Sequence, residues 1–135
     1  MEESLIENAE DVNALTLAYL GDAVFELEVR KRMLLSGSKR VDKLHKRVTA
    51  FVNAASQSRL FSVIEPLRSE AELAVYRRGR NSKTLTAAKH QSIADYRRAT
   101  GFEAVFGYLY LNGSHDRIAE LIDKCFEAED EEIME

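Results

Sequence analysis

An aspartate interrupts an apolar segment in the sequence Leu20-Gly21-Asp22-Ala23-Val24-Phe25-Glu26-Leu27. Apolar residues continue on both sides at spacings of three and four, which predicts a helix over residues 12–34. They form two stripes, so we expect the helix to be covered over much of its circumference. A carboxylate in such a place costs free energy unless something binds it, and Asp22 is therefore a candidate ligand for a cation. The alternative is structural, with Leu20-Gly21-Asp22 ending one helix and capping the next.

A second acid, Glu103, has similar surroundings in Ala99-Thr100-Gly101-Phe102-Glu103-Ala104. It falls on an apolar stripe of a helix predicted over residues 92–112. If the two long helices pack together, the two carboxylates converge, and converging carboxylates suit Mg²⁺, which prefers oxygen ligands. Bound Mg²⁺ can activate a water for attack on a phosphodiester. For Glu103 the alternative is a partly exposed structural glutamate.

The rest of the chain also has helical patterns. We predict further helices over residues 41–63, from the capping box Ser69-Glu70-Ala71-Glu72 to Gly79, and over 115–128. Pro66 allows a turn or a helix start. We interpret the polar residues 77–90 mostly as a loop and expect the acidic tail from Glu127 to fray. With 135 residues, one proline and six glycines, the chain fits a single all-α domain with a core over about residues 12–126.

Several features bear on where the protein works. No run of about 18 apolar residues is present, so we expect no membrane span. The first residues, Met1-Glu2-Glu3-Ser4, are acidic and lack the apolar core of a signal peptide. Cys125 is the only cysteine, which excludes an intramolecular disulfide, and the three histidines are too scattered for a zinc site. Together these features favour a cytoplasmic protein.

Charge is unevenly distributed along the chain, whose net charge is −4. Residues 30–47 contain eight basic residues and one acid, and residues 76–98 contain seven and one, whereas both ends are strongly acidic. Such blocks can form a phosphate-facing surface despite an acidic total. The alternative is two solvated helix faces without a partner.

The densest basic cluster is Arg77-Arg78-Gly79-Arg80-Asn81-Ser82-Lys83. Arginine binds phosphate through two parallel hydrogen bonds, so we predict that this cluster binds RNA, through Arg77, Arg78, Arg80, Asn81 and Lys83. Few aromatic side chains lie between the cations, which argues against stacking on single strands and favours a duplex. The basic residues around Lys46 could extend the same surface. An exposed solubilising loop is the alternative.

The acidic motifs resemble those of the ribonuclease III family. Residues 20–27 are similar to the signature helix of its catalytic domain, and residues 102–109 are similar to its second acidic motif. Two further segments, Asp42-Lys43-Leu44-His45-Lys46 and residues 77–81, resemble Mini-ribonuclease III, a bacterial branch without a double-stranded-RNA-binding domain. The resemblance extends over about residues 12–126.

This resemblance implies an all-α, ribonuclease III endonuclease-domain-like helical bundle and a homodimer in which the signature helices meet. It also implies Mg²⁺-dependent hydrolysis of double-stranded RNA by Asp22 and Glu103, leaving 5′-phosphate and 3′-hydroxyl ends. For the Mini branch, the implied substrate is the precursor of large-subunit (23S) ribosomal RNA. The implied setting is a ribosomal subunit, where a ribosomal protein is a candidate partner.

The sequence also departs from the wider family. Leu15, Ala18 and Thr100 stand where other members carry acids, a departure that the Mini branch shares. Only Asp22 and Glu103 therefore carry over as metal-binding and catalytic residues. The missing acids keep open an alternative function, a non-catalytic double-stranded-RNA-binding or ribosome-assembly module on the same fold.

Overall fold

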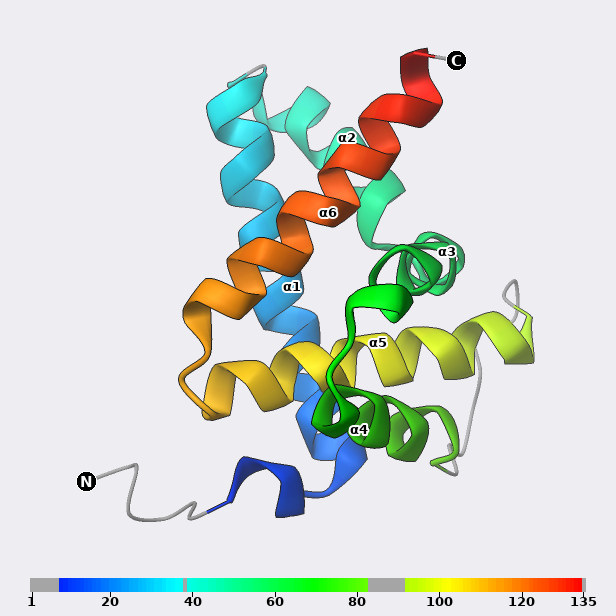
Figure 1. The fold of residues 1–135 in the computed structure, drawn as a ribbon. Coiled ribbons are helices and arrows are strands. Elements are labelled where there is room, and N and C mark those ends of the chain that lie inside the picture. The colour runs from blue at the N-terminus through cyan, green and yellow to red at the C-terminus, as the bar shows by residue number, and fades with distance from the viewer. Residues whose placement is uncertain (1–7, 38, 83–91, 135) are drawn as a thin grey trace.

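A computed structural model describes residues 8–37, 39–82 and 92–134 of the chain, with side chains as far as residue 129. These ranges contain helices and turns but no strand. The elements are η2 (Ala9–Asp11), α1 (Ala14–Ser36), α2 (Val41–Val52), α3 (Ala54–Ile64), η3 (Glu65–Leu67), α4 (Glu70–Arg80), α5 (Ile93–Leu111) and α6 (His115–Met134). The predicted all-α bundle is confirmed (Figure 1).

Helix α5 is the centre of the bundle, and α1, α3 and α4 each make their most extensive contacts with it (Figure 1). It begins after Ser92, whose side chain accepts a hydrogen bond from the backbone N–H of Asp95. Between Ala99 and Leu109 most of its residues are buried. Glu103 therefore lies in an enclosed stretch of α5.

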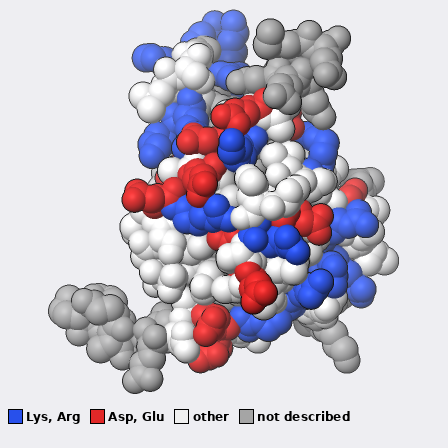
Figure 2. Space-filling model, viewed as in Figure 1, with Lys and Arg blue, Asp and Glu red and all other residues white. Residues whose placement is uncertain are grey.

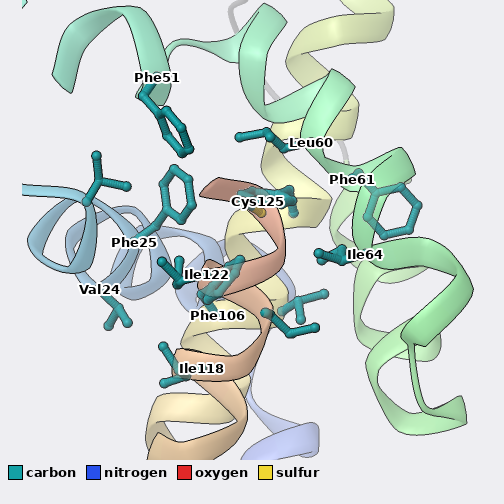
Figure 3. Close-up of a cluster of buried hydrophobic side chains, with 14 of the residues drawn as sticks. Val24, Phe25, Phe51, Leu60, Phe61, Ile64, Phe106, Ile118, Ile122 and Cys125 are labelled. Carbon is teal, nitrogen blue, oxygen red and sulfur yellow. The ribbon is translucent and has the colours of Figure 1, made fainter. Parts of the chain in front are cut away.

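Aromatic rings from several helices form the middle of the hydrophobic core (Figure 3). Phe25 of α1 meets Phe102 of α5 edge-on, with 5.0 Å between ring centroids. Phe51 of α2 stacks on Phe126 of α6 at 4.6 Å. Cys125 lies in the same core, where burial raises the pKa of its thiol to about 12. The thiol therefore stays protonated near neutral pH and belongs to the packing.

The single helix predicted over residues 41–63 is wrong, because the chain breaks at Asn53 into α2 and α3. Asn53 has an extended backbone, and its side-chain oxygen accepts a hydrogen bond from the backbone N–H of Ser56. Its amide donates to the carbonyls at the end of α2. One asparagine thus closes one helix and opens the next. The apolar stripe continues across the break, which explains why periodicity alone did not reveal it.

The predicted capping box at the start of α4 is confirmed, because Ser69 and Glu72 each bond the backbone N–H of the other. The predicted loop over residues 77–90 is wrong at its beginning, since α4 continues to Arg80. Gly79 does not end the helix. A Cβ there would lie 2.8 Å from the Cα of Gly101, so the glycine allows α4 to pack closely against α5. Residues 83–91 lie outside the described ranges.

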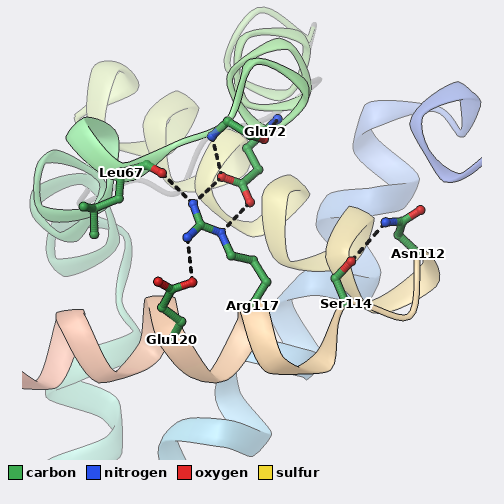
Figure 4. A network of polar contacts seen from close by, with 7 residues as sticks. Leu67, Glu72, Asn112, Ser114, Arg117 and Glu120 are labelled. Atoms are coloured by element: carbon green, nitrogen blue, oxygen red, sulfur yellow. Dashed lines mark hydrogen bonds and ion pairs between the residues drawn. The ribbon is translucent and has the colours of Figure 1, made fainter.

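A buried ion pair fastens α6 to the start of α4 (Figure 4). Arg117 donates to both carboxylate oxygens of Glu72, at 2.8 and 2.9 Å, and to the carbonyl of Leu67 at 2.6 Å. Burial by itself would raise the pKa of Glu72, but the bonds from Arg117 and Ser69 outweigh it and lower the pKa. Because one carboxylate serves both the helix cap and the ion pair, the two helices are held in a fixed relationship.

Helix α6 is longer than the predicted 115–128 and continues to Met134. One contact along the extra length is an ion pair between Glu129 and Arg59 of α3. The segment expected to fray is therefore helical through Met134. In the described ranges, neither α6 nor any other helix combines the length and hydropathy that crossing a membrane requires.

Candidate active site

Two glycines bring the backbones of α1 and α5 into direct contact. A Cβ on Gly21 would lie 1.7 Å from the carbonyl oxygen of Glu103, and one on Gly107 would lie 1.9 Å from the carbonyl oxygen of Leu17. No side chain larger than hydrogen fits at either position without moving a helix. Helix α1 runs unbroken through this point, so Gly21 and Asp22 do not form a cap between two helices.

The contact places the carboxylates of Asp22 and Glu103 side by side. Asp22 is exposed, whereas Glu103 is half-buried among the core residues of α5. Burial raises the pKa of Glu103, and the charge and hydrogen bonding of Asp22 raise it further, to about 8. Asp22 can affect Glu103 in this way only if the two groups are close neighbours. The predicted convergence of the two acids is therefore found in the structure.

A third polar side chain, Gln57 of α3, reaches the same place. Its amide donates a hydrogen bond of 3.4 Å to Glu103 Oε2. This bond lowers the pKa of Glu103, but burial and Asp22 raise it by more. The sequence analysis missed Gln57, although a signal was present. Gln57, Leu60, Phe61 and Ile64 share one buried helical stripe, and a polar member of such a stripe is the same pattern that revealed Asp22 and Glu103.

These groups fit a small, hard cation better than they fit zinc. Among the described residues, no cluster of three or more His, Cys, Asp or Glu could enclose a metal. Two carboxylates with an open side suit Mg²⁺, which usually binds one or two protein carboxylates and keeps several waters. The raised pKa of Glu103 means that burial and Asp22 disfavour its negative charge. A cation bound beside it would offset this effect and stabilise the charged carboxylate.

The positions of the missing acids supply no further carboxylate. Ala18 is buried in α1, and Leu15 is exposed on its surface. Thr100 is also buried, and its hydroxyl donates to the carbonyl of Tyr96 within α5. These three positions therefore leave Asp22 and Glu103 as the candidate metal ligands, while nearby Glu26 forms an ion pair with Arg30.

The arginines of the predicted RNA-binding cluster lie in the last turn of α4, and Asn81 follows them. These residues differ in what they contact. Arg77 is exposed at the end of α4. Arg78 donates to the backbone carbonyls of Glu10 and Val12, which holds the segment before α1 against α4. Arg80 lies over the ring of Tyr76 at 5.7 Å and donates to Asn81 at 3.2 Å. Lys83 lies outside the described residues.

A basic groove lies where the end of α4 meets the start of α5. It has a volume of about 300 Å³, and its lining residues are Arg80, Asn81, Ile93, Ala94, Arg97 and Arg98. Figure 2 shows basic side chains gathered at the lower right of the molecule, over this region. The sequence analysis noted the charge of this block but did not single out Arg97 and Arg98. The basic residues around Lys46 do not extend the groove, because α2 lies at the opposite end of α1 (Figure 1).

An apolar surface adjoins Asp22 on α1. Tyr19 is 83% exposed and Leu27 is 66% exposed, although both belong to stripes that were predicted to be covered. Together with Leu20, Ala23 and the polar side chains of Asp22, Glu26 and Arg30, they line an open hollow of about 500 Å³. Within the single chain, the expected covering of the two stripes is therefore incomplete at these two positions and at Leu15. Exposed apolar area of this kind commonly marks an interaction site.

The helical fold is that of a nuclease domain of the ribonuclease III type. Residues 15–114 match the family model described as "Ribonuclease III domain". The chain belongs to the ribonuclease III family, whose members are endoribonucleases that act on double-stranded RNA and generally depend on a divalent metal. The expected family is thereby confirmed, and with it the enzymatic class.

Within this family, the chain is similar to proteins named Mini-ribonuclease 3. It is 41% identical over 125 residues to the one from Brevibacillus brevis, covering 93% of each chain. It is 43% identical to the one from Clostridium tetani, covering 90% of this chain and 81% of that protein. Among solved structures it resembles protein FN1578 from Fusobacterium nucleatum, with a TM-score of 0.77, 35% identity, and coverage of 84% and 92% of the two chains.

Proposed function

We propose that the chain cleaves double-stranded RNA with Mg²⁺ held by Asp22 and Glu103, leaving 5′-phosphate and 3′-hydroxyl ends. The observation that carries this proposal is the contact between α1 and α5, which brings the two carboxylates together. When bound there, Mg²⁺ would activate a water and neutralise negative charge on the phosphate. Asp22 is exposed and would bind the metal on the side that faces the substrate, whereas half-buried Glu103 would bind it on the side that faces the core.

The basic groove between α4 and α5 is where we propose that the duplex binds. Its arginines can contact phosphates on successive turns of an RNA backbone without reading base sequence. Arg77 and Arg80 would contribute from α4, Asn81 from the residue after it, and Arg97 and Arg98 from α5. Arg78 supports this surface by holding the preceding segment in place, and Lys83 would extend it along the chain.

The natural substrate in this proposal is the precursor of 23S ribosomal RNA, cut in the cytoplasm during assembly of the large ribosomal subunit. The resemblance to the Mini branch supports this substrate, and similarity to proteins named Mini-ribonuclease 3 agrees with it. A ribosomal protein would present the RNA. Without contacts to base edges, recognition of one site requires help from the structure of the RNA or from such a partner.

We also propose that two copies of the chain pair through the exposed apolar face of α1. Tyr19 and Leu27 lie on this face beside Asp22. Closing the face against its own copy would remove these side chains from water, a contribution of about 25 cal/mol per Å² of apolar surface. It would also place two pairs of carboxylates in one assembly, one pair for each strand of the duplex.

The direct test is incubation of the purified protein with a duplex RNA and with the authentic ribosomal precursor, with and without Mg²⁺. We expect Mg²⁺-dependent cuts in both strands and products that carry 5′-phosphates. The small number of acids favours one rival function, a module that binds RNA without cutting it. Tight duplex binding without cleavage of either RNA, at any Mg²⁺ concentration, would establish that rival.

A further inference from the structure

Gln57 is a large polar side chain in an apolar setting. It is 2% exposed and shares the inward stripe of α3 with Leu60, Phe61 and Ile64. A buried amide costs free energy unless it is hydrogen-bonded, so a glutamine at this position requires a polar partner. The partner found in the structure is the carboxylate of Glu103.

Three other buried polar side chains of the described residues bond elsewhere. Ser56 donates to the carbonyl of Ala50, and Thr100 donates to that of Tyr96. Glu72 is held by its ion pair with Arg117. These three contacts stabilise helix ends and helix packing, whereas the contact of Gln57 is with a residue of the candidate active site.

The NH₂ group of Gln57 donates to Glu103 Oε2. This orientation suits the ionised carboxylate that would bind a metal, because an ionised carboxylate only accepts hydrogen bonds. At 3.4 Å the bond is long for an N–H donor. Hydrogen bonds in active sites often tighten when the substrate binds.

The hydrogen bond from Gln57 to Glu103 also connects a third helix to the candidate active site. Asp22 comes from α1, Glu103 from α5 and Gln57 from α3, so the carboxylate of Glu103 is located from two sides. Carboxylates that bind metals are usually held by such outer hydrogen bonds. Ala18 and Thr100 supply no further acid, so neutral Gln57 acts on the Glu103 carboxylate beside Asp22.

We propose that Gln57 is a positioning residue, whose amide holds the Glu103 carboxylate in the orientation that binds the metal together with Asp22. The inference rests on the proposed metal site. It assigns to α3 a part in catalysis through Glu103, without contact between Gln57 and the RNA. Loss of an outer hydrogen bond of this type commonly weakens metal affinity by about 10- to 100-fold.

The first test uses Gln57→Met, which keeps the length of the side chain but removes the donor. We expect the Mg²⁺ concentration for half-maximal single-turnover cleavage to rise about 10- to 100-fold, with cleavage largely restored by excess Mg²⁺. The KM for RNA at saturating Mg²⁺ should stay within about twofold. Independently of activity, the rise in melting temperature on addition of Mg²⁺ should become smaller. Ser58→Ala, a change at the next buried residue of α3, should alter none of these values.

A second variant covers the case in which Gln57→Met does not fold. Gln57→Glu keeps the size of the side chain but sets a third carboxylate beside Glu103. We expect its melting temperature in EDTA to fall and the stabilisation by Mg²⁺ to exceed that of the wild type, because the cation neutralises the repulsion. Ser58→Asp also buries an acid on α3, but its response to Mg²⁺ should match the wild type.

The results separate the two proposals. If the wild type responds to Mg²⁺ and both Gln57 variants respond as it does, the positioning role is wrong while the metal site stands. If the wild type itself shows neither Mg²⁺-dependent cleavage nor stabilisation by Mg²⁺, the metal site is wrong and the role of Gln57 is overturned with it.

Discussion

Gly21 of α1 lies so close to the backbone of Glu103 in α5 that an added Cβ would come within 1.7 Å of the Glu103 carbonyl oxygen. The same residue precedes Asp22 in sequence. Together with Gly107, this glycine therefore allows the close approach of the two helices that brings the two acids near each other. The packing of the core and the geometry of the site depend on the same contact.

Gly21→Ala should therefore damage stability and activity together. The methyl group meets backbone atoms that cannot rotate away, so α1 and α5 must separate, at a cost of about 1–3 kcal/mol or more. Urea unfolding and single-turnover cleavage measure the two effects. Gly37→Ala is the matched control, because its nearest obstacle is the flexible side chain of Arg47. A Gly21→Ala protein with the stability and rate of the wild type would show that the helices are not in contact.

The exposed apolar face of α1 gives a prediction about assembly. Leu27→Glu places a charge on a side chain that is 66% exposed in the single chain, so the monomer should fold normally. Burying that charge in a dimer is costly, and the variant should be monomeric. Sedimentation should give twice the chain mass of 15.3 kDa for the wild type and the single chain mass for the variant. Val41→Glu, on an apolar side chain of α2 that is also exposed, should remain dimeric. A dimeric Leu27→Glu protein would place the interface elsewhere.

The groove between α4 and α5 predicts a measurable dependence on salt. Arg97→Ala removes one phosphate contact, which should weaken binding of any duplex RNA and reduce the slope of log affinity against log salt by about one. Fluorescence anisotropy in EDTA measures both without cleavage. Lys124→Ala, which removes a surface lysine paired with Glu127 on α6, serves as the control. Equal slopes for the wild type and Arg97→Ala would exclude the groove from the binding surface.

The pKa of Glu103 predicts how stability changes with pH. Its ordinary value is 4.5, and burial followed by the influence of Asp22 raises it to about 8 in the folded chain. Between these values the folded protein binds the extra proton, so its metal-free stability falls as pH rises through this window. Glu103→Gln removes the titrating group. In EDTA the variant should melt roughly 3–10 °C above the wild type at pH 8 and approach it near pH 4.5.

Scanning calorimetry over this pH range tests the prediction. Glu127→Gln, at an exposed glutamate of α6, is the control variant. A difference in melting temperature that does not change with pH would mean that Glu103 is ionised throughout. Because the proton and the metal compete for the same oxygens, Mg²⁺ should also stabilise the wild type more strongly at pH 8 than at pH 6.

The sequence was sufficient to predict the two long helices and to single out Asp22 and Glu103 as charges within apolar stripes. Apolar periodicity gave α1 and α5 to within two residues at each end, because helices buried on several sides carry a strong repeating pattern. It failed at Asn53, where the stripe keeps its phase across a break made by the hydrogen bonds of one side chain. Capping of this kind depends on local geometry that periodicity does not record.

The site was only partly predictable for a different reason. Asp22 and Glu103 stood out as charges in apolar stripes, but a neutral glutamine in a serine-rich helix gave a weaker signal, although Gln57 contacts the same carboxylate. The exposed positions of Tyr19 and Leu27 show a second limit. An apolar stripe indicates that a surface is covered, but it does not distinguish covering by the same chain from covering by a partner.

The most direct measurement is single-turnover cleavage of a duplex RNA with Mg²⁺ by the wild type, Asp22→Asn and Glu103→Gln, with RNA binding measured in EDTA. Both variants should lose at least roughly three orders of magnitude in rate, because each removes a charged ligand of the metal. Both should bind RNA as the wild type does, because the basic groove is unchanged. If either variant cleaves at the wild-type rate, the two carboxylates do not form the catalytic site.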